Sequence, residues 1–162
     1  MFNMLKKIYS FFVSLIATGL FSGKIKYISG TAGSFVAIIL YYFIAQLPIF
    51  IQFGILILTT IIGTLSIYTY LSITKQQGKD PKEVVIDEIV AVFLICFIAK
   101  LITPELKPQN YLVVFALFRF FDILKPYPIS VIDKKMKNPI GIMLDDILAG
   151  FLSVCIYIII FA

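Results

Sequence analysis

The chain has 162 residues, of which 60% are hydrophobic and only 14% are charged, and its net charge is +5. This is the composition of a single-domain integral membrane protein, whose basic loops are expected near anionic lipid headgroups; neither nucleic acid nor a nucleotide is an expected partner. The chain contains no histidine, which excludes imidazole as a general base, phosphate carrier or metal ligand, so catalysis must use carboxylates, lysine, arginine, hydroxyls or a hard metal ion.

The first segment predicted to be helical is 4–22. After Lys6 and Lys7, its apolar residues recur every three or four positions on one face, and hydroxyl side chains occupy the opposite face. This pattern predicts an amphipathic helix in the membrane interface, so 1–27 is assigned to an N-terminal interfacial helix and loop. A membrane-crossing helix and a secretory signal peptide are the alternatives for this segment.

The remainder, 28–162, is predicted to form a catalytic helical bundle, within one membrane-embedded domain that covers 1–162. The fold class is all-α: a polytopic integral membrane helical bundle with about four to five membrane helices plus the N-terminal amphipathic helix. Cys96 and Cys155 fall within apolar segments and are expected to be buried and unpaired. After a polar loop at 22–34, the helices are expected at about 35–47, 50–73, 80–103, 111–124 and 138 to the C-terminus.

Two of these helices have similar starts. Asp80 and Asn138 are the expected N-caps, and each is followed by a proline at the first helical position. After five intervening residues each helix has an acidic pair, so that the pattern [DN]-P-x5-D-[DE]-I-[VL]-A occurs twice. Both pairs would lie about 9–10 Å into parallel helices, at ~1.5 Å per residue, and face one shared site. The alternative is a chance similarity of two short capped helices.

The lysines indicate an orientation. With a cytoplasmic N-terminus, eleven of the thirteen lysines lie on the inner side, and only Lys100 and Lys107 lie outside. Eight of the nine acidic residues fall on the same inner side, Glu105 being the exception. The chemistry is therefore predicted at the cytoplasmic face of the membrane.

The acidic residues predict a metal site. A carboxylate within a membrane helix costs about 2.5–3.5 kcal/mol, so several of them require a neutralising partner. One arginine and one nearby lysine are too few, whereas Mg²⁺ is a hard cation that binds through oxygen ligands. Solvated acids at headgroup level are the alternative. The predicted metal ligands are Asp87, Glu88, Asp122, Asp145 and Asp146.

Cationic and backbone groups predict a phosphate site beside these acids. Arg119 and Lys125 flank Asp122 at intervals of three residues, so they are expected to bind phosphate oxygens near a metal ligand. A purely structural Arg119–Asp122 pair is the alternative. The glycine-rich loop at 22–34, before the helix expected at about 35–47, offers backbone N–H groups to an anion. Its expected phosphate contacts are Gly30, Thr31, Gly33 and Ser34.

Four motifs together resemble the bacterial phosphatidylglycerophosphatase A family. They are GTAGS at 30–34, DPKEVVIDEIVA at 80–91, FRFFDILKP at 118–126 followed by Tyr-Pro, and GIMLDDILAG at 141–150. The motifs extend over most of the chain in the order that the family has, and the third and fourth are specific in combination.

The resemblance implies a multi-pass enzyme of the bacterial cytoplasmic membrane. It would hydrolyse the terminal phosphomonoester of phosphatidylglycerophosphate, a phospholipid substrate in the bilayer, with Mg²⁺ as cofactor. Both attack by water and an aspartyl-phosphate intermediate are open. A small ion transporter and a phosphatidyltransferase are the alternative functions, although the acids lie near one face and no phosphatidyltransferase array is present. The expected catalytic set is Asp87, Asp122, Arg119, Lys125 and Asp145.

Overall fold

The protein is described by a computed structural model that covers the backbone of 2–161 and the side chains of 4–161. This part of the chain is all-helical. Its elements are α1 (Phe2–Ala17), the 3₁₀ helix η1 (Ser22–Lys24), α2 (Ser29–Ile44), α3 (Ile49–Thr74), α4 (Ile86–Ile102), α5 (Pro108–Leu124), α6 (Ile129–Lys135) and α7 (Pro139–Phe161).

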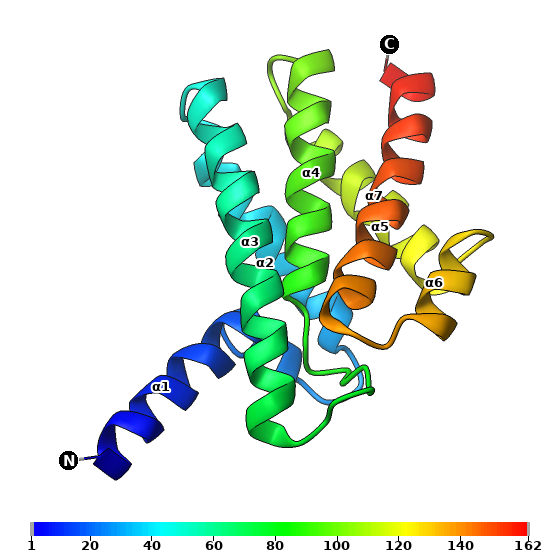
Figure 1. Cartoon of the computed structure of the whole chain (residues 1–162). Coiled ribbons are helices and arrows are strands. Elements are labelled where there is room, and N and C mark those ends of the chain that lie inside the picture. Colours follow the sequence, from blue (N-terminus) through cyan, green and yellow to red (C-terminus); the bar gives the residue numbers. More distant parts are fainter. Residues whose placement is uncertain (1, 162) are drawn as a thin grey trace.

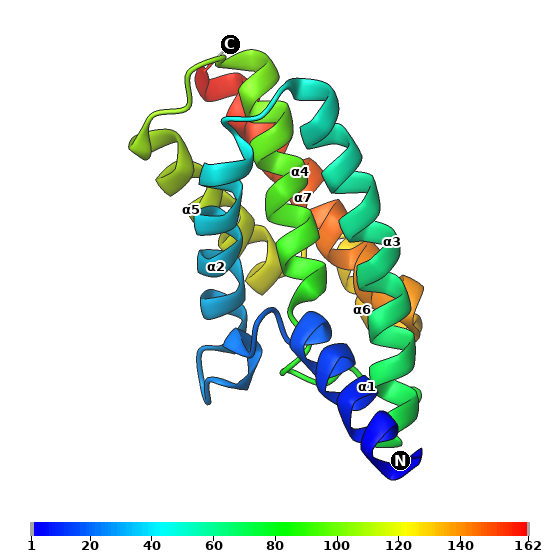
Figure 2. The same ribbon diagram turned by 90° about the vertical axis from the view of Figure 1, so that its left-hand side faces the viewer.

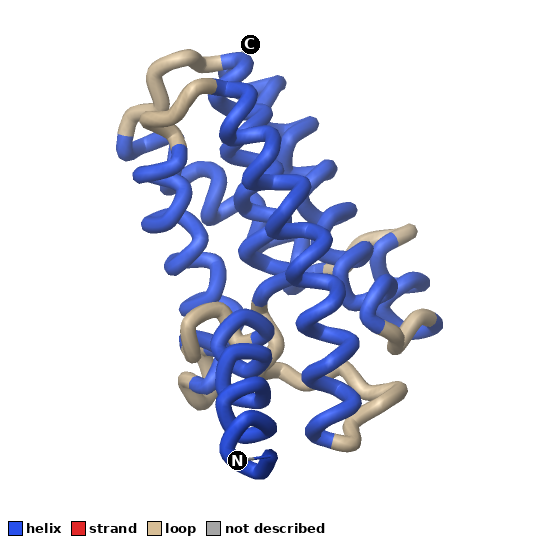
Figure 3. Tube along the Cα trace, turned by 60° about the vertical axis from the view of Figure 1, so that its left-hand side comes forward, coloured by secondary structure: helices blue, strands red, loops and turns tan. Residues whose placement is uncertain are grey.

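The long helices alternate in direction (Figures 1 and 2). Helices α2, α4 and α7 run one way, while α3 and α5 run the other way. The loops gather at the two ends of the bundle, as Figure 3 shows. One end therefore brings together the first turns of α2, α4 and α7 with the last turn of α5, although these segments lie far apart in the sequence.

Helix α4 is the centre of the bundle, since it packs against α2, α3, α5 and α7. Its sequence is apolar on all sides from Ile89 to Ala99, and Val90, Val92, Ile95 and Cys96 are buried. A helix that is apolar all round is stable only when neighbours cover it, so this sequence requires a central position.

Helix α1 extends away from the bundle at its N-terminal end (Figure 1). Val13 and Ala17 near its C-terminal end are buried, but Ile8, Phe11 and Phe12 are exposed. The predicted apolar face is thus largely uncovered by the protein, as expected for a helix whose apolar face meets lipid. The helix is shorter than predicted: it ends at Ala17, and a turn leads to η1.

Within the described part of the chain, two helices are long and apolar enough to cross a membrane. They are α3 with 26 residues and α7 with 23, whereas α2 is a shorter apolar helix. Helix α3 lies at the side of the bundle and leaves large apolar side chains uncovered, including Phe50, which is 85% exposed. Cys155 on α7 is also exposed, so the prediction that both cysteines are buried is wrong for this one.

Two further predicted boundaries are wrong, and one helix was not predicted. Helix α2 begins at Ser29, so the GTAGS motif is helical and not a loop. Helix α4 begins at Ile86 and not at the Asp80-Pro81 step, because Val85 is held outside the helix: its N–H donates to the Ala17 carbonyl at 3.1 Å and its buried side chain packs beside Gly33. Helix α6 was not predicted at all.

Candidate active site

All five predicted metal ligands line one cavity of about 490 Å³ at the end of the bundle where α2, α4 and α7 begin. Asp87 and Glu88 come from the first turn of α4, and Asp145 and Asp146 come from the second turn of α7. The acidic pairs therefore meet, as the repeated pattern predicts, but not at equal depth in their helices. This space is called the acidic cavity below; Arg119, Asp122, Lys125 and Gly30 also line it.

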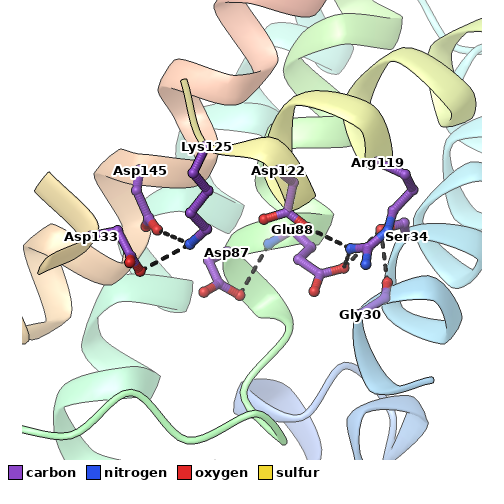
Figure 4. A network of polar contacts seen from close by, with 9 residues as sticks. All are labelled: Gly30, Ser34, Asp87, Glu88, Arg119, Asp122, Lys125, Asp133 and Asp145. Carbon is purple, nitrogen blue, oxygen red and sulfur yellow. Dashed lines mark hydrogen bonds and ion pairs between the residues drawn. The ribbon is translucent and has the colours of Figure 1, made fainter. Parts of the chain in front are cut away.

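Arg119 is the cation on one side of the acidic cavity (Figure 4). Its Nη1 atom lies 2.6 Å from Asp122 Oδ2 and 3.3 Å from Glu88 Oε2, so one guanidinium links α5 to α4. The Ser34 hydroxyl on α2 donates to the same Glu88 oxygen at 2.7 Å. The buried Nε of Arg119 has no acceptor in the described structure, which leaves one unused donor at the site.

Lys125 is the cation on the other side (Figure 4). It follows the last residue of α5 with φ 42°, and its Nζ lies 2.5 Å from Asp145 Oδ2 and 3.0 Å from Asp133 Oδ1. Burial alone would lower the pKa of the Lys125 ammonium, but its hydrogen bonds to Asp145 and Asp133 and the charges of these acids raise that pKa above its ordinary value. These acids therefore favour the charged ammonium form of Lys125.

Asp133 is a neighbour of the site that the sequence did not reveal, because α6 was not predicted. Burial alone would raise its pKa, but hydrogen bonds from Lys125 and Lys137 hold the pKa of this carboxyl below its ordinary value. Lys137 also pairs with Asp80 at 3.3 Å. The short helix α6, which carries Asp133, and the segment around Asp80 and Lys137 thus help to fix the position of Lys125. In the sequence, the basic residues Lys134 and Lys135 are the signal that could have indicated the end of this short helix.

Asp87 and Asp146 differ from the other acids. Both are buried, and within the described residues neither forms an ion pair with a lysine or arginine. Asp87 accepts a hydrogen bond from the Glu88 N–H at 3.0 Å, whereas no side-chain hydrogen bond to Asp146 is found within 4–161. Six carboxylates and three cations line the acidic cavity, which leaves a formal surplus of three negative charges. Buried charges of one sign are costly, so the site favours an additional cation.

The donors fit Mg²⁺ in chemistry and in charge, since carboxylate oxygens are its preferred protein ligands. Their present arrangement is not that of an assembled ion site: no three acidic side chains within 4–161 converge closely enough to hold one ion. Arg119 and Lys125 already engage three of the five predicted ligands. The metal ligands and the cofactor therefore stay predictions.

The GTAGS residues occupy different environments. Gly30 lies against the Glu88–Arg119 pair, where a Cβ atom would come within 2.4 Å of Glu88 Oε1. Gly33 instead packs against Val85, where a Cβ atom would come within 2.7 Å of Val85 Cβ. Ser34 is fully buried and hydrogen-bonded to Glu88, and Thr31 is exposed but does not line the acidic cavity. Only Gly30 of these four predicted phosphate contacts lines that cavity.

Comparisons with known proteins agree on one family. The model of the phosphatidylglycerophosphatase A family matches 15–161. The phosphatidylglycerophosphatase A of Haemophilus influenzae is 41% identical over 148 residues, covering 89% of this chain and 85% of that protein. The Escherichia coli phosphatidylglycerophosphatase A is 32% identical over 140 residues, covering 86% and 77%.

A third relative has a different name. It is a putative phosphatidylinositol-3-phosphatase of Bacteroides thetaiotaomicron, 35% identical over 152 residues and covering 89% of this chain and 90% of that protein. No solved structure matches the chain. The family model spans nearly the whole chain, including every residue of the acidic cavity, and two of the three relatives carry the family's name. The chain therefore belongs to the phosphatidylglycerophosphatase A family.

Proposed function

We propose that this protein hydrolyses the terminal phosphomonoester of phosphatidylglycerophosphate and releases phosphatidylglycerol and phosphate. The observation that carries the proposal is the acidic cavity, where Arg119 and Lys125 lie among six carboxylates at one end of an apolar bundle. This arrangement suits a phosphate group that reaches the site from the headgroup layer while its acyl chains stay in the bilayer. The family membership and the names of two relatives support the choice of this lipid.

The membrane arrangement is part of the proposal. Helices α3 and α7 cross the membrane, and α2, α4 and α5 complete the bundle within it, so that the acidic cavity opens at the cytoplasmic face. The positive-inside distribution of lysine supports this orientation, because the α3–α4 connection, which contains Lys75, Lys79 and Lys82, lies at the cavity end. The α4–α5 loop, which Lys100 and Lys107 flank in the sequence, lies at the opposite end.

The residues of the site have separable roles in the proposed reaction. Arg119, which has an unused Nε donor, and Lys125 would bind the non-bridging oxygens of the phosphate. Asp87 and Asp146, which form no ion pair with a cation among the described residues, would lead the binding of Mg²⁺, with Glu88, Asp122 and Asp145 as the remaining ligands. When bound, Mg²⁺ would supply charge neutralisation at the phosphate. Overall, water adds across the P–O bond, and the glycerol oxygen leaves with a proton.

The test is phosphate release by the purified protein in detergent, with Mg²⁺ or with excess EDTA. We expect hydrolysis of phosphatidylglycerophosphate that is lost with EDTA and restored by Mg²⁺. Asp122→Asn and Asp145→Asn should each lower kcat by about 100-fold, the scale of losing one electrostatic contact in an active site. Full activity in EDTA would refute the metal, and full activity of both variants would refute the site.

The relative from Bacteroides supplies a comparison substrate. Phosphatidylinositol 3-phosphate also carries a phosphomonoester on a lipid headgroup, so it should be assayed in parallel with the same protein. We expect a higher kcat/KM for phosphatidylglycerophosphate. The reverse order would show that the site is a lipid phosphomonoesterase with another headgroup preference.

A further inference from the structure

A second and larger cavity, of about 840 Å³, lies beside the acidic cavity. The segment from Gly23 to Ser29, the turn at 81–83 and Tyr70 of α3 form its walls. Ser29, Pro81 and Lys82 line both cavities, so the two spaces adjoin at the first residue of α2. This space is called the basic cavity below.

The charge of the basic cavity is opposite to that of its neighbour. Lys24, Lys26 and Lys82 line it, and within 4–161 none of the three forms an ion pair with a carboxylate. Its one acidic residue, Glu83, accepts a hydrogen bond from the Tyr70 hydroxyl at 2.6 Å. The lining therefore has a formal surplus of two positive charges, next to the negative surplus of the acidic cavity. This polarity favours an anion in the basic cavity.

The wall that carries two of these lysines has the character of a headgroup-level loop. Tyr27 is 90% exposed, and Ile25 and Ile28 are also exposed. The Lys24 ammonium lies 4.6 Å from the centroid of the Phe21 ring, and the Lys26 ammonium lies 5.1 Å from that of the Tyr27 ring. Aromatic rings beside lysine ammonium groups are typical of the membrane–water interface, where phospholipid phosphates lie.

A lipid that carries two phosphates would match the two adjoining cavities. We propose that the basic cavity binds the phosphodiester of the lipid substrate, while the terminal phosphomonoester lies in the acidic cavity; this inference rests on the proposed function. The N-terminus of the 16-residue helix α2 lies between them and favours negative charge on either side. The favourable contacts at the diester would offset the repulsion between the acidic cavity and an anionic substrate.

The experiment compares two substrates that differ in the diester. Phosphatidylglycerophosphate contains it, whereas phosphatidate has its phosphomonoester directly on diacylglycerol. In the double variant Lys24→Gln/Lys26→Gln, we expect KM for phosphatidylglycerophosphate to rise about tenfold, with kcat within about twofold; this corresponds to two weak charged contacts. The ratio of kcat/KM for phosphatidylglycerophosphate to that for phosphatidate should fall about tenfold.

A matched control removes two charges elsewhere at the same end of the molecule. Lys134 and Lys135 on α6 are exposed and line neither cavity. The variant Lys134→Gln/Lys135→Gln should keep the substrate ratio of the wild type. An unchanged ratio in Lys24→Gln/Lys26→Gln, or an equal fall in the control, would overturn the proposal, since the basic cavity would then have no specific part in recognition.

A binding measurement separates this inference from the proposed function. Phosphatidylglycerol has the diester but no phosphomonoester, and diacylglycerol has neither. In detergent micelles, phosphatidylglycerol should raise the unfolding temperature of the wild type above the value with diacylglycerol, and Lys24→Gln/Lys26→Gln should lose this difference. If the wild type hydrolysed neither phosphatidylglycerophosphate nor phosphatidate, the proposed function would fail, and the binding measurement would still test the basic cavity. Equal shifts of the unfolding temperature in the wild type and in Lys24→Gln/Lys26→Gln would refute diester binding there.

Discussion

Buried acids with and without a cationic partner set the residue-scale energetics of the acidic cavity. Asp146 is buried without an ion pair in the described structure, whereas Arg119 forms ion pairs with both Glu88 and Asp122. Removing the unpaired charge of Asp146 should therefore not destabilise the protein, whereas removing Arg119, the partner of two carboxylates, should destabilise it.

This contrast is testable with two substitutions. Asp146→Asn should lower kcat by about 100-fold but leave the unfolding temperature in Mg²⁺-free detergent equal to or above that of the wild type, because it removes repulsion. Arg119→Gln should lower activity and also destabilise the protein by about 1–3 kcal/mol, because two carboxylates lose their donor. Thermal unfolding and phosphate release measure both. Destabilisation by Asp146→Asn in the absence of Mg²⁺ would show that this carboxylate has a structural partner.

Gly30 lies where a side chain would enter the Glu88–Arg119 pair. Gly30→Ala places a methyl group 2.4 Å from Glu88 Oε1 and 2.7 Å from Arg119 Nη1, so the pair must shift. We expect phosphate release to fall at least about tenfold, since a misplacement near 1 Å is costly in an active site. Gly54→Ala is the matched control, because a Cβ atom there meets nothing within 4 Å. Equal activity of the two variants would contradict the role of this contact.

At the scale of the element, two similar motifs have different outcomes. Asn138 caps α7, since its Oδ1 accepts a hydrogen bond from the Gly141 N–H at 2.8 Å. Asp80 does not cap α4, because α4 begins six residues later at Ile86, with Val85 at the N-cap position. The local preference of an Asp-Pro step for a helix start is overridden by the contacts of Val85 with Ala17 and Gly33.

The two caps can be compared by substitution. Asn138→Ala should lower the free energy of unfolding by about 1 kcal/mol, the usual cost of losing an N-cap. Asp80→Ala removes only the partly exposed pair with Lys137 and should cost less than about 0.5 kcal/mol. Denaturant titration in a fixed micelle measures both. A larger loss for Asp80→Ala would indicate that α4 starts where the sequence pattern predicts.

At the scale of the whole molecule, the alternation of the helices places the α3–α4 connection, which contains Lys79, and the α4–α5 connection, which contains Lys107, at opposite ends of the bundle. In a background with Cys96→Ala and Cys155→Ala, an impermeant thiol reagent added to intact cells should label Lys107→Cys. Lys79→Cys should react only after the membrane is permeabilised. Labelling of both residues, or of Lys79→Cys alone, in intact cells would contradict the proposed cytoplasmic position of the acidic cavity.

Much of the molecule follows from local patterns along the chain. Apolar run lengths predict the all-helical class, and α3 lies within one residue of its expected bounds. The acidic pairs, Arg119 and Lys125 can be identified as candidates because charges are costly in an apolar segment, wherever that segment folds. The motif resemblance is confirmed by the family match over 15–161.

Other features depend on contacts between segments far apart in the chain. The late start of α4, the helical GTAGS motif and the position of Asp133 beside Lys125 arise when Val85 packs against α1 and α2 and when α6 folds back beside α7. Residue spacing contains no information about such distant partners. Charge and hydropathy along the chain thus identify the groups of the site, while packing around α4 determines which acids are paired with a cation and which are not.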